Sequence, residues 1–128
     1  MSSYVPDGHN SVSPYLLIEN VEQEIEFLLK TFEATLLYKI DGPNNSIKHA
    51  EVKIDDSVIM LGERQNQGFS VISSTHIYVK SVDETYKRAL ASGATSVSEP
   101  KDQAYGDRSA GVKDAQGNFW WIGTHVKK

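Results

Sequence analysis

His49 and Glu51 form the clearest acid–base pair in the sequence, because a single residue separates them within a predicted strand. Alternate residues of a strand point to the same face of its sheet, so we expect the imidazole and the carboxylate to share a face. Such a pair could bind a ligand or shuttle a proton. It could equally be a salt-bridged pair that only stabilises the sheet. His49 and Glu51 are therefore candidates for both catalysis and ligand binding.

A second polar group stands at Tyr105-Gly106-Asp107-Arg108, within a long connection expected over residues 101–109. The guanidinium of Arg108 could hold a carboxylate or another planar polar group of a ligand. The alternative, which we favour slightly, is an internal Asp107–Arg108 pair that fixes the loop to the sheet. Tyr105 is the better candidate for ligand contact, because its ring can pack while its hydroxyl forms a hydrogen bond.

Nucleophilic catalysis has little support. The chain contains no cysteine, which excludes thiolate nucleophiles, thiolate metal ligands and disulfides. Ser13 and Ser74 do not lie in a Gly-x-Ser-x-Gly turn and have no assigned base. The available chemistry is that of imidazole, carboxylate, phenol, guanidinium and indole groups.

Hydrophobic periodicity predicts the elements that position these residues in the first half of the chain. Asn20 is suited to cap a helix, and the apolar residues after it recur at helical spacing along one stripe. The predicted strands cover residues 13–18, 35–40, 49–54 and 58–61, and a tight turn at 55–56 joins the last two. The order is therefore β-α-β-β-β.

The second half repeats this order. Ser81 and Glu84 have the spacing of a capping box, and Gly93 is placed to end the helix that they begin. Strands are predicted at 76–79, 95–97, 109–113 and 118–124. Ser81 follows Asn20 by 61 positions, and the same offset places the turn at 55–56 on 116–117 without a gap. We predict one α+β domain with an N-terminal arm (1–11) and two βαβββ modules (12–64 and 73–126).

Length and charge narrow the function classes. The 128 residues fit one domain, and 13 Lys and Arg against 17 Asp and Glu give a net charge of −4. This balance disfavours a nucleic-acid-binding surface. The longest apolar runs are far shorter than the roughly 20 residues that span a bilayer, and the N-terminus shows no secretory signal. We therefore expect a soluble, cytoplasmic protein that binds neither membrane nor nucleic acid.

Several motifs occur in an order that resembles the vicinal oxygen chelate superfamily, and in particular its PhnB-like glyoxalase/bleomycin-resistance branch. The motifs are Val5-Pro6-Asp7-Gly8-His9, Val12-Ser13-Pro14-Tyr15-Leu16, Lys48-His49-Ala50-Glu51, Tyr105-Gly106-Asp107-Arg108-Ser109 and Gly117-Asn118-Phe119-Trp120-Trp121. The resemblance implies tandem βαβββ modules that form a curved, half-open mixed barrel with helices outside. It also implies a ligand cleft and a homodimer, in some members with modules exchanged between chains.

The resemblance also implies where a metal would be bound. The four ligand positions carry over to Ser13, Met60, Ser74 and Trp121 in this sequence. None of these is the carboxylate or imidazole that a divalent metal prefers, so we expect no metal cofactor. The alternative is an atypical set of His49, Glu51 and His76 that binds Zn, Ni, Mn or Fe.

The resulting prediction is a metal-independent protein that binds a flat or partly apolar small molecule. Trp121 and Tyr105 would stack on the ligand, whereas Trp120, on the opposite face, would belong to the core. His49, Glu51 or Arg108 would orient it. Three further ligand-binding candidates complete the cleft: Tyr15, Met60 and His76. The alternative is a metal-dependent lyase, isomerase or dioxygenase built on the atypical ligand set.

Overall fold

The computed structural model describes residues 4–64 and 71–126 and contains two βαβββ modules in tandem. The elements of the first module are β1 (Tyr15–Ile18), α1 (Val21–Phe32), β2 (Thr35–Asp41), a short 3₁₀ turn (Pro43–Asn45), β3 (Ile47–Ile54) and β4 (Ser57–Glu63). Those of the second are β5 (Ser74–Tyr78), α2 (Val82–Ala91), β6 (Thr95–Asp102), β7 (Asp107–Lys113) and β8 (Phe119–His125).

Each module folds its strands into one mixed sheet of four. The strand orders are β1-β4-β3-β2 and β5-β8-β7-β6, so the first strand of each module lies at a sheet edge. It pairs in parallel with the last strand, and the other pairings are antiparallel. The predicted α+β architecture is therefore confirmed, with two sheets that do not close into a barrel.

The helices begin where the capping residues predict. The Asn20 side chain accepts a hydrogen bond from the Gln23 backbone N–H at 3.0 Å, and the Ser81 hydroxyl accepts one from the Glu84 N–H at 3.3 Å. Gly93 follows the end of α2 with a φ of +104°, a left-handed conformation that favours glycine.

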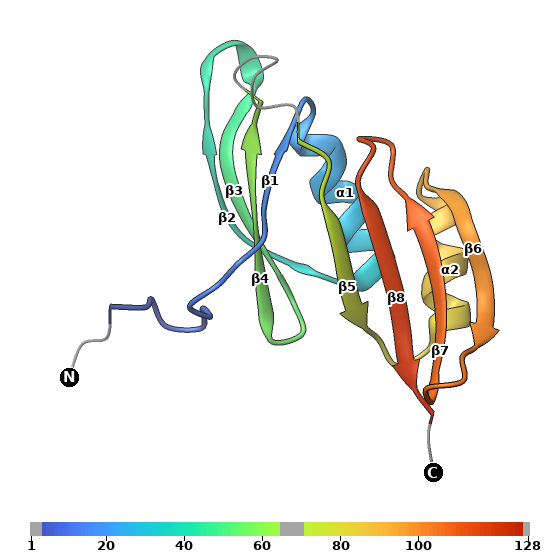
Figure 1. Cartoon of the computed structure of the whole chain (residues 1–128). Helices are drawn as coiled ribbons and strands as arrows, with labels where there is room; N and C mark the ends of the chain where they lie inside the picture. Colours follow the sequence, from blue (N-terminus) through green and yellow to red (C-terminus); the bar gives the residue numbers. More distant parts are fainter. Residues whose placement is uncertain (1–3, 65–70, 127–128) are drawn as a thin grey trace.

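One core joins the two modules. Helix α1 lies between the sheets and packs on α2, β3 and β4, while α2 packs on β6, β7 and β8 (Figure 1). Trp120 of β8 is fully buried, and its ring lies 5.3 Å from that of Phe32 and 6.5 Å from that of Phe27, both on α1. The helix-facing side of each sheet is thus core, and the opposite side, here called the outer face, carries the polar and aromatic candidates.

Three sequence-based details are wrong. Strand β1 begins at Tyr15 rather than at residue 13, because Pro14 cannot donate a backbone hydrogen bond. Strand β6 runs to Asp102 rather than residue 97, and β7 begins at Asp107, so only residues 103–106 connect them. Pairing with β8 extends β7 over residues that were expected in a loop, since Asp107 lies opposite His125.

The two modules also do not superpose at one constant offset. Ile54 pairs with Ser57 across a two-residue turn, whereas Lys113 pairs with Phe119 across five residues. The longer turn is held by the Asp114 carboxylate, which accepts the backbone N–H groups at positions 116 and 118. By strand pairing, β6 and β7 follow β2 and β3 by 60 positions, whereas the helices and the first and last strands keep the offset of 61.

Candidate functional site

Glu51 is the centre of a hydrogen-bonded network on the outer face of the first sheet. Its side chain is only 6% exposed. Oε2 accepts the Tyr38 hydroxyl at 3.0 Å and lies 3.1 Å from Nε2 of His49. Oε1 lies 2.6 Å from Nε2 of His9, which comes from the described segment before β1 (residues 4–14), called the arm from here on. The structure thus brings His49 and Glu51 together as the strand spacing predicts, and it adds two partners.

This network keeps Glu51 ionised. Burial by itself would raise the pKa of the carboxyl, but hydrogen bonds from His9, His49 and Tyr38 together hold that pKa below its usual value. The same hydrogen bonds raise the pKa of the His9 imidazole and of the Tyr38 hydroxyl, in each case mainly through contact with Glu51. The outer face therefore holds a fixed negative charge among proton donors.

A pocket of about 540 Å³ opens over Glu51. The arm and the first sheet provide all its walls, and the arm runs away from the second module (Figure 1). The lining residues are Tyr4, Val5, Pro6, His9, Asn10, Ser11, Ser13, Tyr15, Tyr38, Glu51 and Met60. Aromatic and apolar groups, together with a few small polar ones, thus surround a single carboxylate, a composition typical of small-molecule sites.

Gly62 shapes one wall of this pocket. It lies beside Tyr15 on the neighbouring strand, and a Cβ at position 62 would come within 2.7 Å of the Tyr15 hydroxyl oxygen. The Tyr15 ring also makes an edge contact with His49 at 5.7 Å between ring centroids. The absence of a side chain at Gly62 allows Tyr15 to lie across the sheet and next to the network.

The outer face of the second sheet carries a related but smaller network around Asp107. This carboxylate is 4% exposed, accepts the Tyr78 hydroxyl at 2.9 Å and lies 2.8 Å from Nδ1 of His125. The hydrogen bond with His125 is the main reason why the pKa of Asp107 is lowered. His76 packs edge-on against Tyr78 with ring centroids 4.6 Å apart. His125 carries no local signal in the sequence, although counting outward from the turn at 114–118 pairs it with Asp107.

Trp121 lies on this same outer face. Its indole N–H donates to the Ser74 hydroxyl at 2.7 Å, and its ring stacks on Phe119 with 6.1 Å between centroids. The ring also covers Gly111, where a Cβ would come within 2.5 Å of it. Trp121 is therefore half-buried on the second sheet, and it does not line the Glu51 pocket.

The structure separates the remaining candidates from the Glu51 pocket. Arg108 forms ion pairs at 3.1 Å with Asp83 of α2 and with Asp102 of β6, so its expected partner Asp107 is replaced by these two. Tyr105 is 68% exposed in the connection between β6 and β7. Within one chain, the ligand-binding candidates thus fall into two groups, one on each sheet.

The donor chemistry does not suit the metal centre that the resemblance implies. Of the four positions, Met60 offers a thioether, Trp121 offers no lone pair, and the hydroxyl of Ser74 already accepts from Trp121. The alternative set is also divided, because His49 and Glu51 lie on the first sheet and His76 on the second. Across residues 4–64 and 71–126, no group of three His, Asp or Glu side chains is arranged to hold a metal ion.

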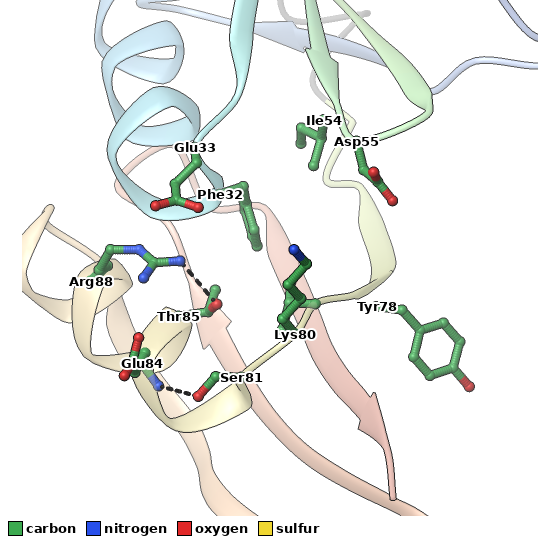
Figure 2. A pocket seen from close by; sticks show the side chains of 11 residues that line it. Phe32, Glu33, Ile54, Asp55, Tyr78, Lys80, Ser81, Glu84, Thr85 and Arg88 are labelled. Carbon is green, nitrogen blue, oxygen red and sulfur yellow. Dashed lines mark hydrogen bonds between the residues drawn. The ribbon is translucent and has the colours of Figure 1, made fainter.

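A second hollow of about 550 Å³ lies at the junction of the modules, apart from Glu51 but with Tyr78 of the Asp107 network in its lining (Figure 2). Its charges are of both signs, with Lys80 and Arg88 opposite acidic side chains that include Glu33 and Glu84. Arg88 is engaged, since it donates to the Thr85 hydroxyl at 3.2 Å and to the Thr31 backbone carbonyl at 3.0 Å. This mixed and internally bonded surface offers less to a ligand than the pocket over Glu51.

Comparison with known proteins assigns the family. Residues 10–122 match the model of the Glyoxalase/Bleomycin resistance protein/Dioxygenase superfamily. The chain belongs to this superfamily. A Mycobacterium tuberculosis H37Rv protein, Rv0887c, is 32% identical over 92% of this chain and 76% of its own length. A Mycobacterium bovis protein, Mb0911c, is 32% identical over 92% of this chain and 85% of its own length.

Solved structures of this superfamily share the fold. TioX from Micromonospora sp. ML1 superposes with a TM-score of 0.74 at 21% identity, covering 91% of this chain and 100% of its own. The fosfomycin resistance protein FosX from Mesorhizobium loti has a TM-score of 0.66 at 13% identity and covers 90% of this chain and 91% of its own.

In the described part of the chain, neither helix is long and apolar enough to cross a membrane.

Proposed function

We propose that this superfamily member binds a small, partly apolar organic molecule in the pocket over Glu51, without a metal ion. The observation that carries the proposal is the buried Glu51 carboxylate, which donors from three side chains hold at the base of an open pocket. A buried charge with fixed hydrogen-bond partners can orient a ligand, and the surrounding rings supply contact area.

The chemistry of the inherited positions supports metal independence. Ser13 and Met60 line the pocket where this superfamily would place metal ligands, and neither is a carboxylate or imidazole. Their presence instead extends the surface available to an organic ligand. Polar orientation would then come from Glu51 and His49, and packing from Tyr15 and Met60.

We further propose that the active form is a homodimer in which one copy covers the outer face of another. Large side chains with apolar surface are exposed on both outer faces: Tyr15 (54%), Tyr38 (46%) and Ile40 (49%) on the first sheet and Tyr78 (60%) on the second. Exposed apolar surface of this kind favours association. Pairing of unlike outer faces would bring Trp121 of one copy toward the Glu51 pocket of the other.

The decisive experiment is a ligand screen on protein treated with EDTA. A library of small aromatic and alicyclic compounds would be tested by ¹H–¹⁵N NMR against the full-length chain. We expect hits to shift the resonances of Tyr38, Glu51 and Met60, and to bind equally well with and without EDTA. Light scattering in the same buffer would give the mass of the assembly.

Matched variants make the result specific. Tyr38→Phe removes one hydroxyl donor from Glu51, whereas Tyr86→Phe removes a hydroxyl that donates to Ser96 away from the pocket. Only the first should weaken binding. If hits bind only after addition of Zn²⁺, Ni²⁺, Mn²⁺ or Fe²⁺, metal independence is wrong. A monomeric mass for the ligand-bound protein would reject the homodimer.

A further inference from the structure

We propose that the pocket over Glu51 selects ligands in which a cationic nitrogen is attached to a flat apolar group, and that His9 occupies the place of this nitrogen until a ligand displaces it. The proposal rests on the binding function proposed above and names the chemical class of its ligand.

The lining of the pocket contains one carboxylate and no permanent positive charge. Of its eleven lining residues, Glu51 is the one that carries a carboxylate, and no lysine or arginine is among them. His9 is the other titratable side chain that contacts this carboxylate from the arm. A ligand that enters beside Glu51 therefore meets a negative charge with no lysine or arginine in the pocket lining. Lys53, whose ammonium lies beside Gly8 of the arm, is a cation close to this network but is not part of that lining.

The two oxygens of Glu51 have separate partners. Oε2 is bound from within the sheet, by the Tyr38 hydroxyl at 3.0 Å and by His49 at 3.1 Å. Oε1 is bound at 2.6 Å by His9, which belongs to the arm. Withdrawal of His9 would leave one oxygen of a buried, sheet-held carboxylate ready to accept an N–H group from a ligand. Charge-assisted hydrogen bonds of this kind are stronger than neutral ones.

The walls of the pocket suit the rest of such a ligand. Tyr4, Tyr15 and Tyr38 offer aromatic faces and Met60 a polarisable thioether. A cation is attracted to the face of an aromatic ring, and a flat group packs against the rings and the thioether. The imidazole of His9 is itself a flat ring with a nitrogen donor, so it resembles the class of ligand that we propose.

The segment that carries His9 lies outside the paired strands of the sheet. It contains no strand or helix, and its turn is closed locally by a hydrogen bond from the His9 N–H to the Pro6 carbonyl at 3.1 Å. Gly8 in this turn has a φ of +80°, which favours glycine. Displacement of His9 from Glu51 therefore breaks no backbone pairing within the sheet.

The test uses three probes of nearly equal shape: benzamidine (cation), benzamide (neutral) and benzoate (anion). Their affinities for the full-length protein would be measured by NMR titration. We expect benzamidine to bind about ten- to hundredfold more tightly than benzamide, and benzoate more weakly than both. In Glu51→Gln the three affinities should become similar.

The His9→Ala variant tests the displacement. It removes the competing side chain, so benzamidine should bind several-fold more tightly than to the wild type. Tyr86→Phe, which removes a hydroxyl of α2 that donates to Ser96, is the control and should leave the affinity unchanged. If His9→Ala fails to fold, His9→Asn, which is shorter and uncharged, serves the same purpose.

The outcomes separate this proposal from the binding function on which it rests. Equal affinity for benzamidine and benzamide, or preference for benzoate, would overturn the cation selectivity while leaving a small-molecule pocket. Weaker binding of benzamidine to His9→Ala would overturn the displacement, because His9 would then be part of the ligand site. If none of the three probes shifts pocket resonances, both proposals are wrong.

Discussion

Two buried glutamates show how the outer face differs from the junction of the modules. Glu51 on the outer face is surrounded by donors, and its pKa lies below the usual value. Glu24 of α1 is 1% exposed at the junction, where burial and a hydrogen bond with the carboxylate of Asp114 raise its pKa to about 10. The same side chain is thus kept charged in one region and protonated in the other.

The hydrogen-bond partners of the two glutamates explain why their pKa values differ. Asp114 accepts N–H groups from the Trp120 indole and from the backbone at positions 116 and 118, so its carboxylate is well supplied with donors. Glu24 completes this set by donating its own proton across the junction. Gln116 also hydrogen-bonds to Gln23 of α1. At the junction, Glu24 therefore keeps its proton in a hydrogen bond that joins the two modules. On the outer face, Glu51 stays charged and faces a pocket.

The largest expected effect on stability is at Trp120, and it contrasts with a small effect at the adjacent Trp121. Trp120→Ala should lower the free energy of unfolding by about 3–5 kcal/mol, because it empties core space beside Phe27 and Phe32 and removes a donor from Asp114. Trp121→Ala should cost about 1 kcal/mol or less, since its ring lies on the outer face. Urea unfolding of both variants checks this difference. Equal losses would place Trp121 in the core as well.

Glu24→Gln should increase stability at neutral and alkaline pH. Between pH 4.5 and about 10 the folded chain retains a proton on Glu24 that the unfolded chain releases, so wild-type stability falls as pH rises. The limit is about 1.4 kcal/mol per pH unit, or about 3.5 kcal/mol between pH 4.5 and pH 7. Glutamine can still donate an N–H to Asp114 and does not ionise.

Urea unfolding at several pH values, from 4 to 9, would measure this effect. The matched control is Glu26→Gln on the same helix, which removes an exposed pair with Lys30 and should change stability by about 0.5 kcal/mol or less at every pH. A Glu24→Gln variant whose stability followed the wild type across this range would show that Glu24 is ionised in the folded chain.

Glu51→Gln should have the opposite pH dependence. The folded-state pKa of Glu51 is lowered, so the stability that this carboxylate contributes is present above about pH 4.5 and is lost as pH falls through the folded pKa. We expect the variant to be about 1–2 kcal/mol less stable at pH 7, and the difference to shrink on acidification.

The same substitution should lower the pKa of His9 toward its ordinary value, because the Glu51 carboxylate is the main cause of its increase. An NMR titration of the histidine ring protons would measure it. Asp107→Asn is the control, since this carboxylate contacts His125 on the other sheet and should leave His9 unchanged. An unchanged His9 titration in Glu51→Gln would mean that the arm does not contact the sheet in solution.

Local sequence signals predicted the parts of the fold that depend on neighbours along the chain. The caps at Asn20 and Ser81 are examples, as is the shared face of His49 and Glu51. The start of β7 at Asp107 was missed, because its pairing with β8 depends on the length of the turn at 114–118. His9 was missed as a partner of Glu51 for a similar reason. Forty-two positions separate them, and a single histidine in a polar arm carries no local signal.

The smallest expected effect on stability comes from Gly62→Ala. The new Cβ would come within 2.7 Å of the Tyr15 hydroxyl, and this half-exposed ring can move aside, so the cost should be about 1 kcal/mol or less. Moving Tyr15 alters a wall of the Glu51 pocket, so benzamidine affinity should change although the protein remains folded. Gly111→Ala displaces Trp121 on the second sheet in the same way. If the binding site lies on the first sheet alone, only Gly62→Ala should alter benzamidine affinity in a monomeric sample. If both substitutions alter affinity in the assembled protein, the two outer faces contact the same ligand.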